Sequence, residues 1–365
     1  AVVVSHGHLD HAGAVPALLA GDDRPPVHWT PPTRDLALAL ARDTLSLHGS
    51  TPRCPFTETD VARLTQVSTT HGYGDPFEAA GYEVTLRDAG HVPGSAHVLV
   101  DDGETRLWYT GDFHTDDQRL VAGTTARPAA DVVVTESTYA DVSHTPRDRL
   151  ERSFVDLLCE TVWNGGTAVV PAFAIGRTQE VLLVCAAHDI DCYVDGMGQR
   201  VTDRLLEHPA FLRDADALRG ARASARYVEG GTGQRERIAG EAAVVVTTAG
   251  MLGGGPAMTY VPAVADHPGN TIALTGYQVA GTPGRELLET GSLPVDGRHV
   301  SVSARVEQFD FSAHADRAGL RSFLDAYRDA RVLVVHGDDC GRFAGRLRED
   351  GFEASAPGVG DRVTV

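Results

Sequence analysis

The segment His6-Gly7-His8-Leu9-Asp10-His11 places three imidazoles and one carboxylate within six positions, directly behind a run of valines at residues 2–4. Four polar side chains so close together cannot all be packed in an apolar core, and a solvated loop gains nothing from the crowding. Two histidines two positions apart on an extended loop can present their rings to one metal ion. The Asp-His pair that follows can turn toward a second ion. The segment therefore predicts part of a dinuclear metal site, whose other ligands must come from elsewhere in the chain.

The available ligand types favour zinc for such a site. The five cysteines are scattered and never in CxxC spacing, so we expect reduced thiols in a cytoplasm rather than thiolate ligands. A site of histidine and aspartate suits zinc, with manganese or iron less favoured. The cysteines are Cys54, Cys159, Cys185, Cys192 and Cys340.

The length and hydropathy of the chain set further bounds. Its 365 residues are enough for a large core and for two domains. We expect neither a membrane-spanning helix nor a signal peptide, because no apolar run is long enough to cross a bilayer and no basic segment with an apolar stretch precedes the first motif.

The charge balance does not support a polybasic nucleic-acid patch. Fifty acidic residues face thirty-two basic ones, for a formal net charge of −18, and every basic residue is arginine because the chain contains no lysine. Two interpretations remain open: adaptation to a high-salt cytoplasm, or GC-biased codon usage with ordinary acidity. In roughly molar salt the Debye length is about 3 Å. We therefore expect any polyanionic substrate to be held at short range, by arginines, helix N-termini and metal.

Five short β-branched or aromatic runs each lead into a polar side chain, as buried strands do when their carboxyl ends carry functional residues. We expect these ends to share one rim of a sheet system, where open α/β folds bind ligands. His91, on a Gly/Pro-marked turn, can join the same rim. The runs are residues 2–4 before His6, 106–110 before Asp112, 132–135 before Glu136, 309–311 before His314, and 332–335 before His336.

The middle of the chain is predicted to form a separate domain. Helices are predicted over residues 32–47 and 146–163, and from about residue 141 to 300 strand-like and helix-like segments alternate. Such alternation is typical of a doubly wound α/β domain. Apart from this domain, the polar strand ends lie in residues 1–140 and 301–365, so we predict an insertion into a first domain.

Taken in order, these motifs resemble a known family. SHGHLDH, AGHVPGSAH and YTGDF are similar to the metallo-β-lactamase superfamily, and ESTYAD, DFSAHAD and VVHGD resemble its β-CASP nuclease branch. Within that branch, PAFAIGRTQE and TTAGMLGGGPAMTY are similar to the endonuclease subunit of the pre-mRNA cleavage and polyadenylation machinery and its archaeal relatives, and less to ribonuclease J. The resemblance implies an α/β chain: a metallo-β-lactamase αββα sandwich, residues 1–140 and 301–365, with an inserted doubly wound β-CASP domain, residues 141–300. The strands that normally precede the first motif are expected to be missing here.

The resemblance also implies a site. The first zinc ion would be held by His6, His8 and His91, the second by Asp10, His11 and His336, and Asp112 would bridge the two. His314 matches the proposed general acid and Glu136 the carboxylate that pairs with it. Two ions can activate a water for in-line attack, and an imidazolium can protonate the leaving 3′ oxygen.

Each assignment has a structural alternative. A single His or Asp after a strand is often a cap, His314 could start a helix, and Glu136 could form a strand-end salt bridge. Arg177 at a helix start and Tyr277 are candidate substrate-binding residues, for phosphate and base stacking respectively. For these two, a plain helix cap and core packing are the alternatives.

The resemblance implies a zinc-dependent ribonuclease that cuts single-stranded RNA to leave a 3′-hydroxyl and a 5′-phosphate. The inserted domain would cover the metal rim and leave a slot that suits a single strand. Endonuclease and 5′-3′ exonuclease action, in mRNA 3′-end processing or RNA decay, both occur on this fold. The retained His336 favours RNA over DNA. A DNA nuclease and a catalytically inactive RNA-processing scaffold stay open, as do a homodimer and an RNA-processing complex.

Overall fold

A computed structural model of the chain describes residues 1–49, 51, 54–295 and 297–365. The chain forms two compact units. The first combines residues 1–143 with 313–365, and the second comprises residues 144–312. Among the described residues, no helix is both long enough and apolar enough to cross a membrane.

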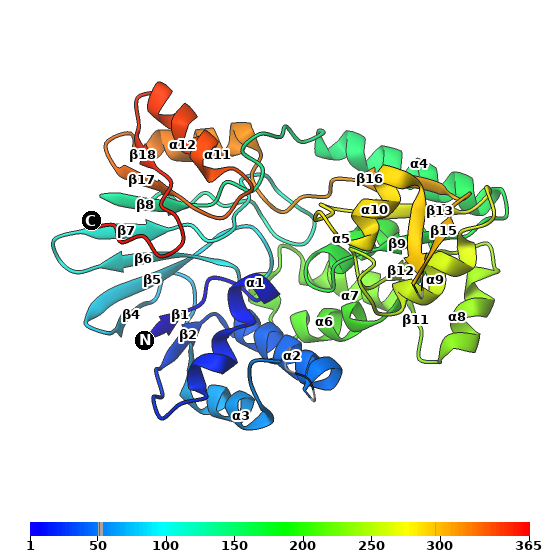
Figure 1. Cartoon of the computed structure of the whole chain (residues 1–365), viewed down its shortest axis with the longest axis horizontal. Coiled ribbons are helices and arrows are strands. Elements are labelled where there is room, and N and C mark those ends of the chain that lie inside the picture. Colours follow the sequence, from blue (N-terminus) through cyan, green and yellow to red (C-terminus); the bar gives the residue numbers. More distant parts are fainter. Residues whose placement is uncertain (50, 52–53, 296) are drawn as a thin grey trace. The chain divides into compact units, whose positions relative to one another are not determined.

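The first unit is built on a seven-stranded sheet with the order β18-β17-β8-β7-β6-β5-β4 (Figure 1). The sheet is antiparallel from β4 to β7 and parallel from β7 to β18. The parallel strands β8 and β17 are rich in valine and mostly buried, as expected for strands covered on both faces. The strands are β4 (Pro76–Ala79), β5 (Tyr82–Asp88), β6 (Ala96–Asp101), β7 (Arg106–Tyr109), β8 (Val132–Thr135), β17 (Arg331–Val334) and β18 (Glu353–Ser355).

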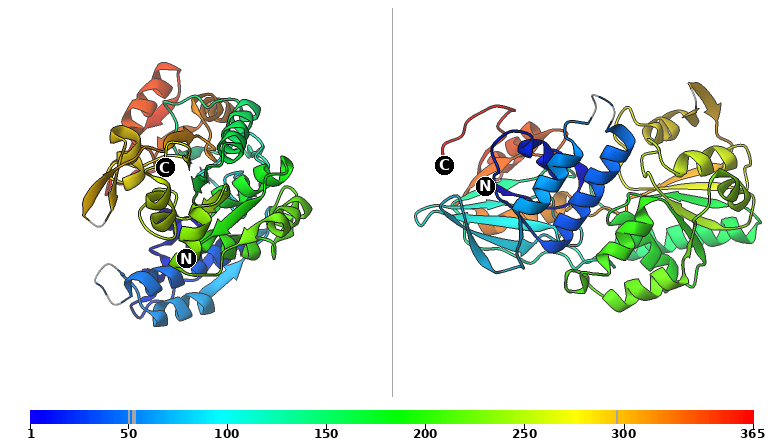
Figure 2. Two further views of the ribbon diagram at one scale, coloured as in Figure 1. Left: turned by 90° about the vertical axis from the view of Figure 1, so that its right-hand side faces the viewer. Right: turned by 90° about the horizontal axis from the view of Figure 1, so that it is seen from below.

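A smaller parallel sheet carries the N-terminal motif. It contains β1 (Val2–Val3), β2 (Val27–Trp29) and β3 (Ser68–Thr70), in that order. Its helices are α1 (Leu9–Ala12), α2 (Pro31–His48) and α3 (Glu58–Val67), and the short 3-10 segment η1 (Val15–Leu19) follows α1. Buried residues of β2, α2 and α3 share one hydrophobic cluster, so these helices cover one face of the small sheet (Figure 2).

The layers of the first unit follow from its hydrophobic clusters. Val3 of the small sheet packs against buried residues of β5 and β6, so the two sheets face each other. On the other side, α11 (Arg317–Leu324) and α12 (Cys340–Glu349) pack on β7, β8 and β17, with the 3-10 segment η3 (Asp325–Tyr327) between them in sequence. Helix, sheet, sheet and helix therefore follow one another, which confirms the predicted αββα sandwich.

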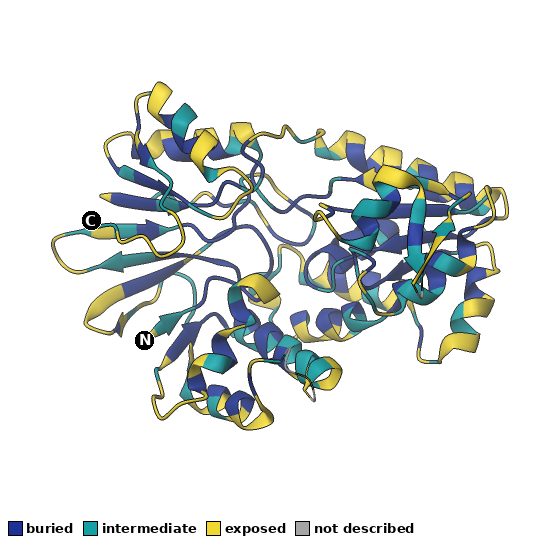
Figure 3. Ribbon diagram, in the orientation of Figure 1, coloured by how far each residue is buried: buried dark blue, intermediate teal, exposed yellow. Residues whose placement is uncertain are grey.

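The second unit has a six-stranded, all-parallel sheet with the order β11-β10-β12-β9-β13-β16. Its four inner strands are almost wholly buried, whereas the edge strands β11 and β16 and the flanking helices carry exposed residues (Figure 3). This arrangement confirms the doubly wound domain. The strands are β9 (Ala168–Pro171), β10 (Cys192–Asp195), β11 (Arg226–Tyr227), β12 (Val244–Thr247), β13 (Thr271–Thr275) and β16 (Arg305–Phe309). The helical segments are α4 (Arg147–Trp163), α5 (Arg177–Ala187), α6 (Met197–Leu205), η2 (Pro209–Phe211), α7 (Ala215–Ser224), α8 (Thr232–Ala239), α9 (Ala257–Val264) and α10 (Pro283–Thr290). A hairpin of β14 (Ser292–Val295) and β15 (Arg298–Ser301), which we did not predict, completes the unit.

The return to the first unit differs from the sequence prediction. We assigned residues 301–312 to the first domain and the run at 309–311 to its sheet. In the structure, β16 pairs with β13 along its full length, so this strand is an edge of the second unit's sheet. The chain re-enters the first unit only at Ala313. A β-branched run followed by a polar residue does not specify which sheet it joins, because that choice depends on the partner strand.

The packing of α11 gives a testable prediction. Phe323 is fully buried, its ring centroid lies 4.3 Å from that of Phe113, and the guanidinium of Arg127 lies 3.9 Å from its centroid. Phe323→Ala should lower the free energy of unfolding by about 3–5 kcal/mol, because the deletion leaves a cavity in a closed core. Urea denaturation measures the loss. The control Leu18→Ala, at a side chain that is 53% exposed, should cost well under ~1 kcal/mol. Equal losses in the two variants would contradict this packing.

Candidate metal centre

The N-terminal segment forms a tight turn after β1. His8 is the N-cap of the single-turn helix α1, so His6 and His8 lie on extended backbone and the Asp10-His11 pair on the helix. Gly7 allows the close approach of this turn to α2, because a Cβ at that position would lie 2.9 Å from Cβ of Leu36. The backbone therefore divides the four side chains into two pairs, as their spacing predicted.

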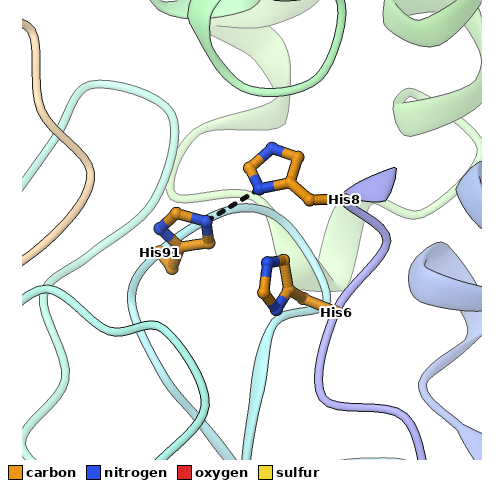
Figure 4. Close-up of side chains that lie close together, drawn as sticks. All are labelled: His6, His8 and His91. Atoms are coloured by element: carbon orange, nitrogen blue, oxygen red, sulfur yellow. Dashed lines mark hydrogen bonds between the residues drawn. The ribbon is translucent and has the colours of Figure 1, made fainter. Parts of the chain in front are cut away.

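His6, His8 and His91 form the first group of donor atoms (Figure 4). Nδ1 of His8 lies 3.0 Å from Nε2 of His91, and the ring of His6 lies 5.0 Å and 4.8 Å from these two rings, centroid to centroid. His91 comes from the loop between β5 and β6. Its Nδ1 donates to the carbonyl oxygen of Ala313 at 2.8 Å, which leaves Nε2 as the atom that faces the group.

Asp10, His11 and His336 form a second, more open group. Nε2 of His336 lies 3.3 Å from Nε2 of His11 and 3.5 Å from Oδ2 of Asp10. His336 follows β17 and has φ +48°, a left-handed conformation that is uncommon for a non-glycine residue. Its Nδ1 lies 3.0 Å from Oγ1 of Thr138, and this hydrogen bond holds the orientation of the ring.

Asp112 lies between the two groups. Its Oδ2 is 3.5 Å from Nε2 of His6 and 3.2 Å from Nε2 of His11, and its Oδ1 is 3.4 Å from Nδ1 of His336. Gly111 delivers this carboxylate from the end of β7: it has φ +54°, and a Cβ there would lie 2.9 Å from Cβ of Ser5. Among the described residues, every group of three metal-ligating side chains is built from the cluster that these residues form, together with His314 and Glu136.

Two buried atoms of the cluster have no hydrogen-bond partner within the described part of the chain: Nε2 of His6 and Oδ1 of Asp112. A buried polar atom without a partner costs free energy, and nearly all such atoms in native proteins are satisfied. Both atoms are lone-pair donors to metals and both point into the cluster. The residues present therefore fit a bound cation.

The pKa values of the three histidines in the first group shift downward, whereas the pKa of His336 in the second group shifts upward. Burial lowers the pKa of His8 to about 4 and lowers those of His6 and His91 well below their ordinary value. In the second group, the hydrogen bond with Asp10 raises the pKa of His336 to about 9. The same hydrogen bond holds the pKa of Asp10 well below its usual range.

His314 and Glu136 form a pair beside the cluster. Nδ1 of His314 lies 2.9 Å from Oε2 and 3.0 Å from Oε1 of Glu136. Glu136 is buried, and the N–H of Phe113 donates to its Oε1 at 2.8 Å. Burial acts to lower the pKa of His314, but the carboxylate of Glu136 outweighs it and raises the pKa. The ring of His314 lies 4.6 Å from that of His91, centroid to centroid.

The structure thus brings together all nine predicted residues of the centre, and their roles as ligands and acid stay predictions. The residues do not share one rim of a single sheet, contrary to our prediction. His6 and His8 follow a strand of the small sheet, and His314 precedes α11. Strands of the large sheet lead into Asp112, Glu136 and His336. The sequence analysis missed two positioning contacts, the Ala313 carbonyl and Thr138. No residue pattern marks a backbone carbonyl, and Thr138 lies within the ESTYAD motif without a signal of its own.

The two substrate-binding candidates lie in the second unit. Arg177 is the first residue of α5, after the N-cap Gly176, and it is buried. Tyr277 follows β13 and is 40% exposed, so it does not pack in the core. Neither residue is tested as a substrate contact by this geometry.

Comparison with known proteins agrees with these observations. Residues 179–287 match the model of the Beta-Casp domain, and residues 299–357 match that of the Zn-dependent metallo-hydrolase RNA specificity domain. RNase aCSPSF2 of Saccharolobus solfataricus is 35% identical over 376 residues, which cover 100% of this chain and 74% of the relative. Probable RNase MJ4 of Methanocaldococcus jannaschii is 31% identical, covering 100% and 88% respectively. Transcription termination factor FttA of Pyrococcus abyssi is 31% identical, covering 93% and 57%.

The opposite pKa shifts give a test of the two metal positions. Neutral His6, His8 and His91 accept an ion without losing a proton, whereas below about pH 9 an ion must displace the proton of His336. Zinc affinity of the second group should fall about tenfold per pH unit below pH 9, because one proton competes. The first group should keep its affinity down to about pH 4. Competition titrations with a chromophoric chelator at pH 6 and 8.5 should therefore resolve two sites, and the zinc affinity of only the second should fall between pH 8.5 and pH 6. Equal weakening of both sites at pH 6 would contradict the assignment.

Proposed function

This chain belongs to the β-CASP ribonuclease branch of the metallo-β-lactamase superfamily, and we propose that it is a zinc-dependent ribonuclease acting on single-stranded RNA. The observation that carries the proposal is the cluster around Asp112, with the His314–Glu136 pair beside it. Hydrolysis of a phosphodiester needs a nucleophile, charge neutralisation and a proton for the leaving oxygen. The cluster and the pair can provide all three.

Two ions fit the two donor groups. His6, His8 and His91 would hold one, Asp10, His11 and His336 the other, and Asp112 would contact both. The all-His/Asp donor set without thiolate favours zinc. Bound ions supply an activated water and neutralise the oxygens of the phosphodiester.

His314 would give a proton to the leaving 3′ oxygen. Its raised pKa keeps more of the imidazolium at neutral pH, and the hydrogen bond to Glu136 through Nδ1 leaves Nε2 to carry the transferred proton. Glu136 orients the ring and is itself fixed by the N–H of Phe113. The products would be a 3′-hydroxyl and a 5′-phosphate.

Two observations support RNA as the substrate. Residues 299–357, which include His314 and His336, match an RNA specificity domain, and both relatives that match the whole of this chain carry the name RNase. We further propose that Arg177 contacts a phosphate and the exposed Tyr277 stacks on a base. The process served would be mRNA 3′-end processing or RNA decay.

We also propose that the enzyme works in a cytoplasm of high salt concentration. It would act there either as a homodimer or within an RNA-processing complex. The supporting features are the net charge of −18 carried without lysine and the five cysteines, which are free in the structure. Dense acidic surfaces stay hydrated in salt, and free thiols persist where the surroundings are reducing.

Removal of the proposed acid tests the mechanism. His314→Ala should lower kcat by about 10²–10⁴-fold, the range of general acid catalysis. Zinc content should not change, because His314 is not among the proposed ligands. His188→Ala, at an exposed histidine of the second unit, is the matched control and should cleave normally. Steady-state cleavage of a 5′-labelled RNA and elemental analysis give the two readouts. Normal cleavage by His314→Ala would refute its role.

The competing functions separate in one set of assays. RNA and DNA oligomers of the same sequence distinguish a ribonuclease from a DNA nuclease, and we expect cleavage of RNA alone. A circular RNA distinguishes internal cutting, which we expect, from attack at the 5′ end. An inactive scaffold would bind RNA with close to zero zinc per chain, whereas the enzyme should bind two.

A further inference from the structure

The three chain segments that carry Glu136, His314 and His336 also contact one another a few residues further along the chain. Beyond Glu136, the chain reaches Asp141. Beyond His314 and His336 it enters α11 and α12, where three arginines contact Asp141: Arg317, Arg342 and Arg346. The His314–Glu136 pair, His336 and this arginine cluster therefore come from the same three segments of the first unit.

All three arginines converge on one residue. Nη1 of Arg342 donates to Oδ2 of Asp141 at 3.0 Å, and Nη1 of Arg346 donates to Oδ1. Nη2 of Arg317 donates to the backbone carbonyl of Asp141 at 2.6 Å. Two guanidinium groups thus contact the carboxylate and a third contacts the carbonyl of the same residue, which leaves two positive charges in excess among these four residues.

The cluster is accessible and fixed. The side chain of Arg342 is 59% exposed and that of Asp141 41%. Each guanidinium has five N–H donors, and the contacts with Asp141 use one nitrogen of each. The helices that carry the arginines are anchored by Leu320, Phe323 and Leu347 in the buried core. The arginines therefore present donors to solvent from a rigid base.

Nearby carboxylates are engaged elsewhere. Oδ1 of Asp316 accepts the N–H of Gly319 at the start of α11, and Oδ1 of Asp339 accepts the N–H of Arg342 at the start of α12. Both are N-caps, whose charge is balanced by the helix terminus. Stability alone gives little reason for this cluster, because exposed ion pairs contribute about 0–1 kcal/mol each.

We propose that Arg317, Arg342 and Arg346 bind a backbone phosphate of the RNA, with Asp141 taking the place of that phosphate in the free protein. Guanidinium groups match phosphate oxygens in bidentate geometry. Contacts of this kind act at short range, as a chain of net charge −18 requires. All three arginines lie within the RNA specificity domain match, residues 299–357. This inference rests on the proposed ribonuclease function.

The arginines are tested by RNA binding in a His314→Ala background, so that the RNA stays intact. Arg342→Gln and Arg346→Gln should each weaken binding of a single-stranded RNA several-fold. Each should also reduce the slope of log Kd against log [KCl] by about one, the signature of a lost phosphate contact. In zinc-loaded enzyme with His314 intact, the effect should fall on KM more than on kcat. Arg348→Gln is the matched control: this arginine lies on the same helix, and its Nη1 donates to the carbonyl of Ala354.

Asp141→Asn separates a phosphate site from a purely structural clamp. If Asp141 competes with phosphate, its neutralisation should tighten RNA binding, opposite in sign to the arginine variants. If the cluster only holds the segments together, Asp141→Asn should weaken binding and lower the Tm, as the arginine variants would. Weakening by Arg342→Gln and Arg346→Gln together with tightening by Asp141→Asn supports the proposal, and any other combination overturns it. A wild-type protein that neither binds nor cleaves RNA would instead refute the ribonuclease function itself.

Discussion

The buried carboxylate of Asp112 and the imidazoles around it are the interaction on which the first unit depends. His6, His11, His91 and His336 each place a nitrogen within 4.0 Å of this carboxylate. Burial alone would raise the pKa of Asp112, but the hydrogen bond from His11 and the neighbouring imidazoles lower it well below its usual range. A buried anion is costly unless a positive charge balances it, and burial lowers the pKa values of His6 and His91, so these two rings stay neutral. Bound cations would meet that requirement and would satisfy the unpartnered atoms of His6 and Asp112.

The backbone, more than side-chain packing, holds these rings in place. The carbonyl of Ala313 fixes the tautomer of His91, and the N–H of Phe113 fixes Glu136. Close approach at Gly7 and Gly111 leaves no room for a Cβ. Such contacts limit the freedom of each ring, so little reorganisation is needed when an ion or a substrate binds.

The points where the chain passes between the two units lie close in sequence to Glu136 and His314. The chain leaves the first unit after Ser143, seven residues beyond Glu136, and returns at Ala313, one residue before His314. On the side of the first unit the two crossings are joined, because the N–H of Arg317 donates to the carbonyl of Val142 and a bridge pairs Tyr139 with Asp316. The His314–Glu136 pair and the arginine cluster therefore lie at the base of the insertion, where both crossings contribute residues.

Local spacing alone was enough to predict the N-terminal ligand segment, the polar residues after most strands and the doubly wound second unit. These features depend on short stretches of sequence, because residue type and the spacing of apolar residues determine them. The sheet assigned to residues 301–312 was wrong, because β16 pairs with a strand 34 positions earlier and no local pattern identifies that partner.

By itself, the sequence determined the chemistry: which donors exist, the absence of thiolate pairs and lysine, and the order in which the motifs occur. Only the tertiary structure decided which nitrogen of each histidine faces the centre, that His336 adopts a left-handed conformation, and that three arginines meet Asp141. The physical reason is that residue identity is local. Tautomers, backbone angles and charge clusters instead depend on atoms brought from hundreds of residues away.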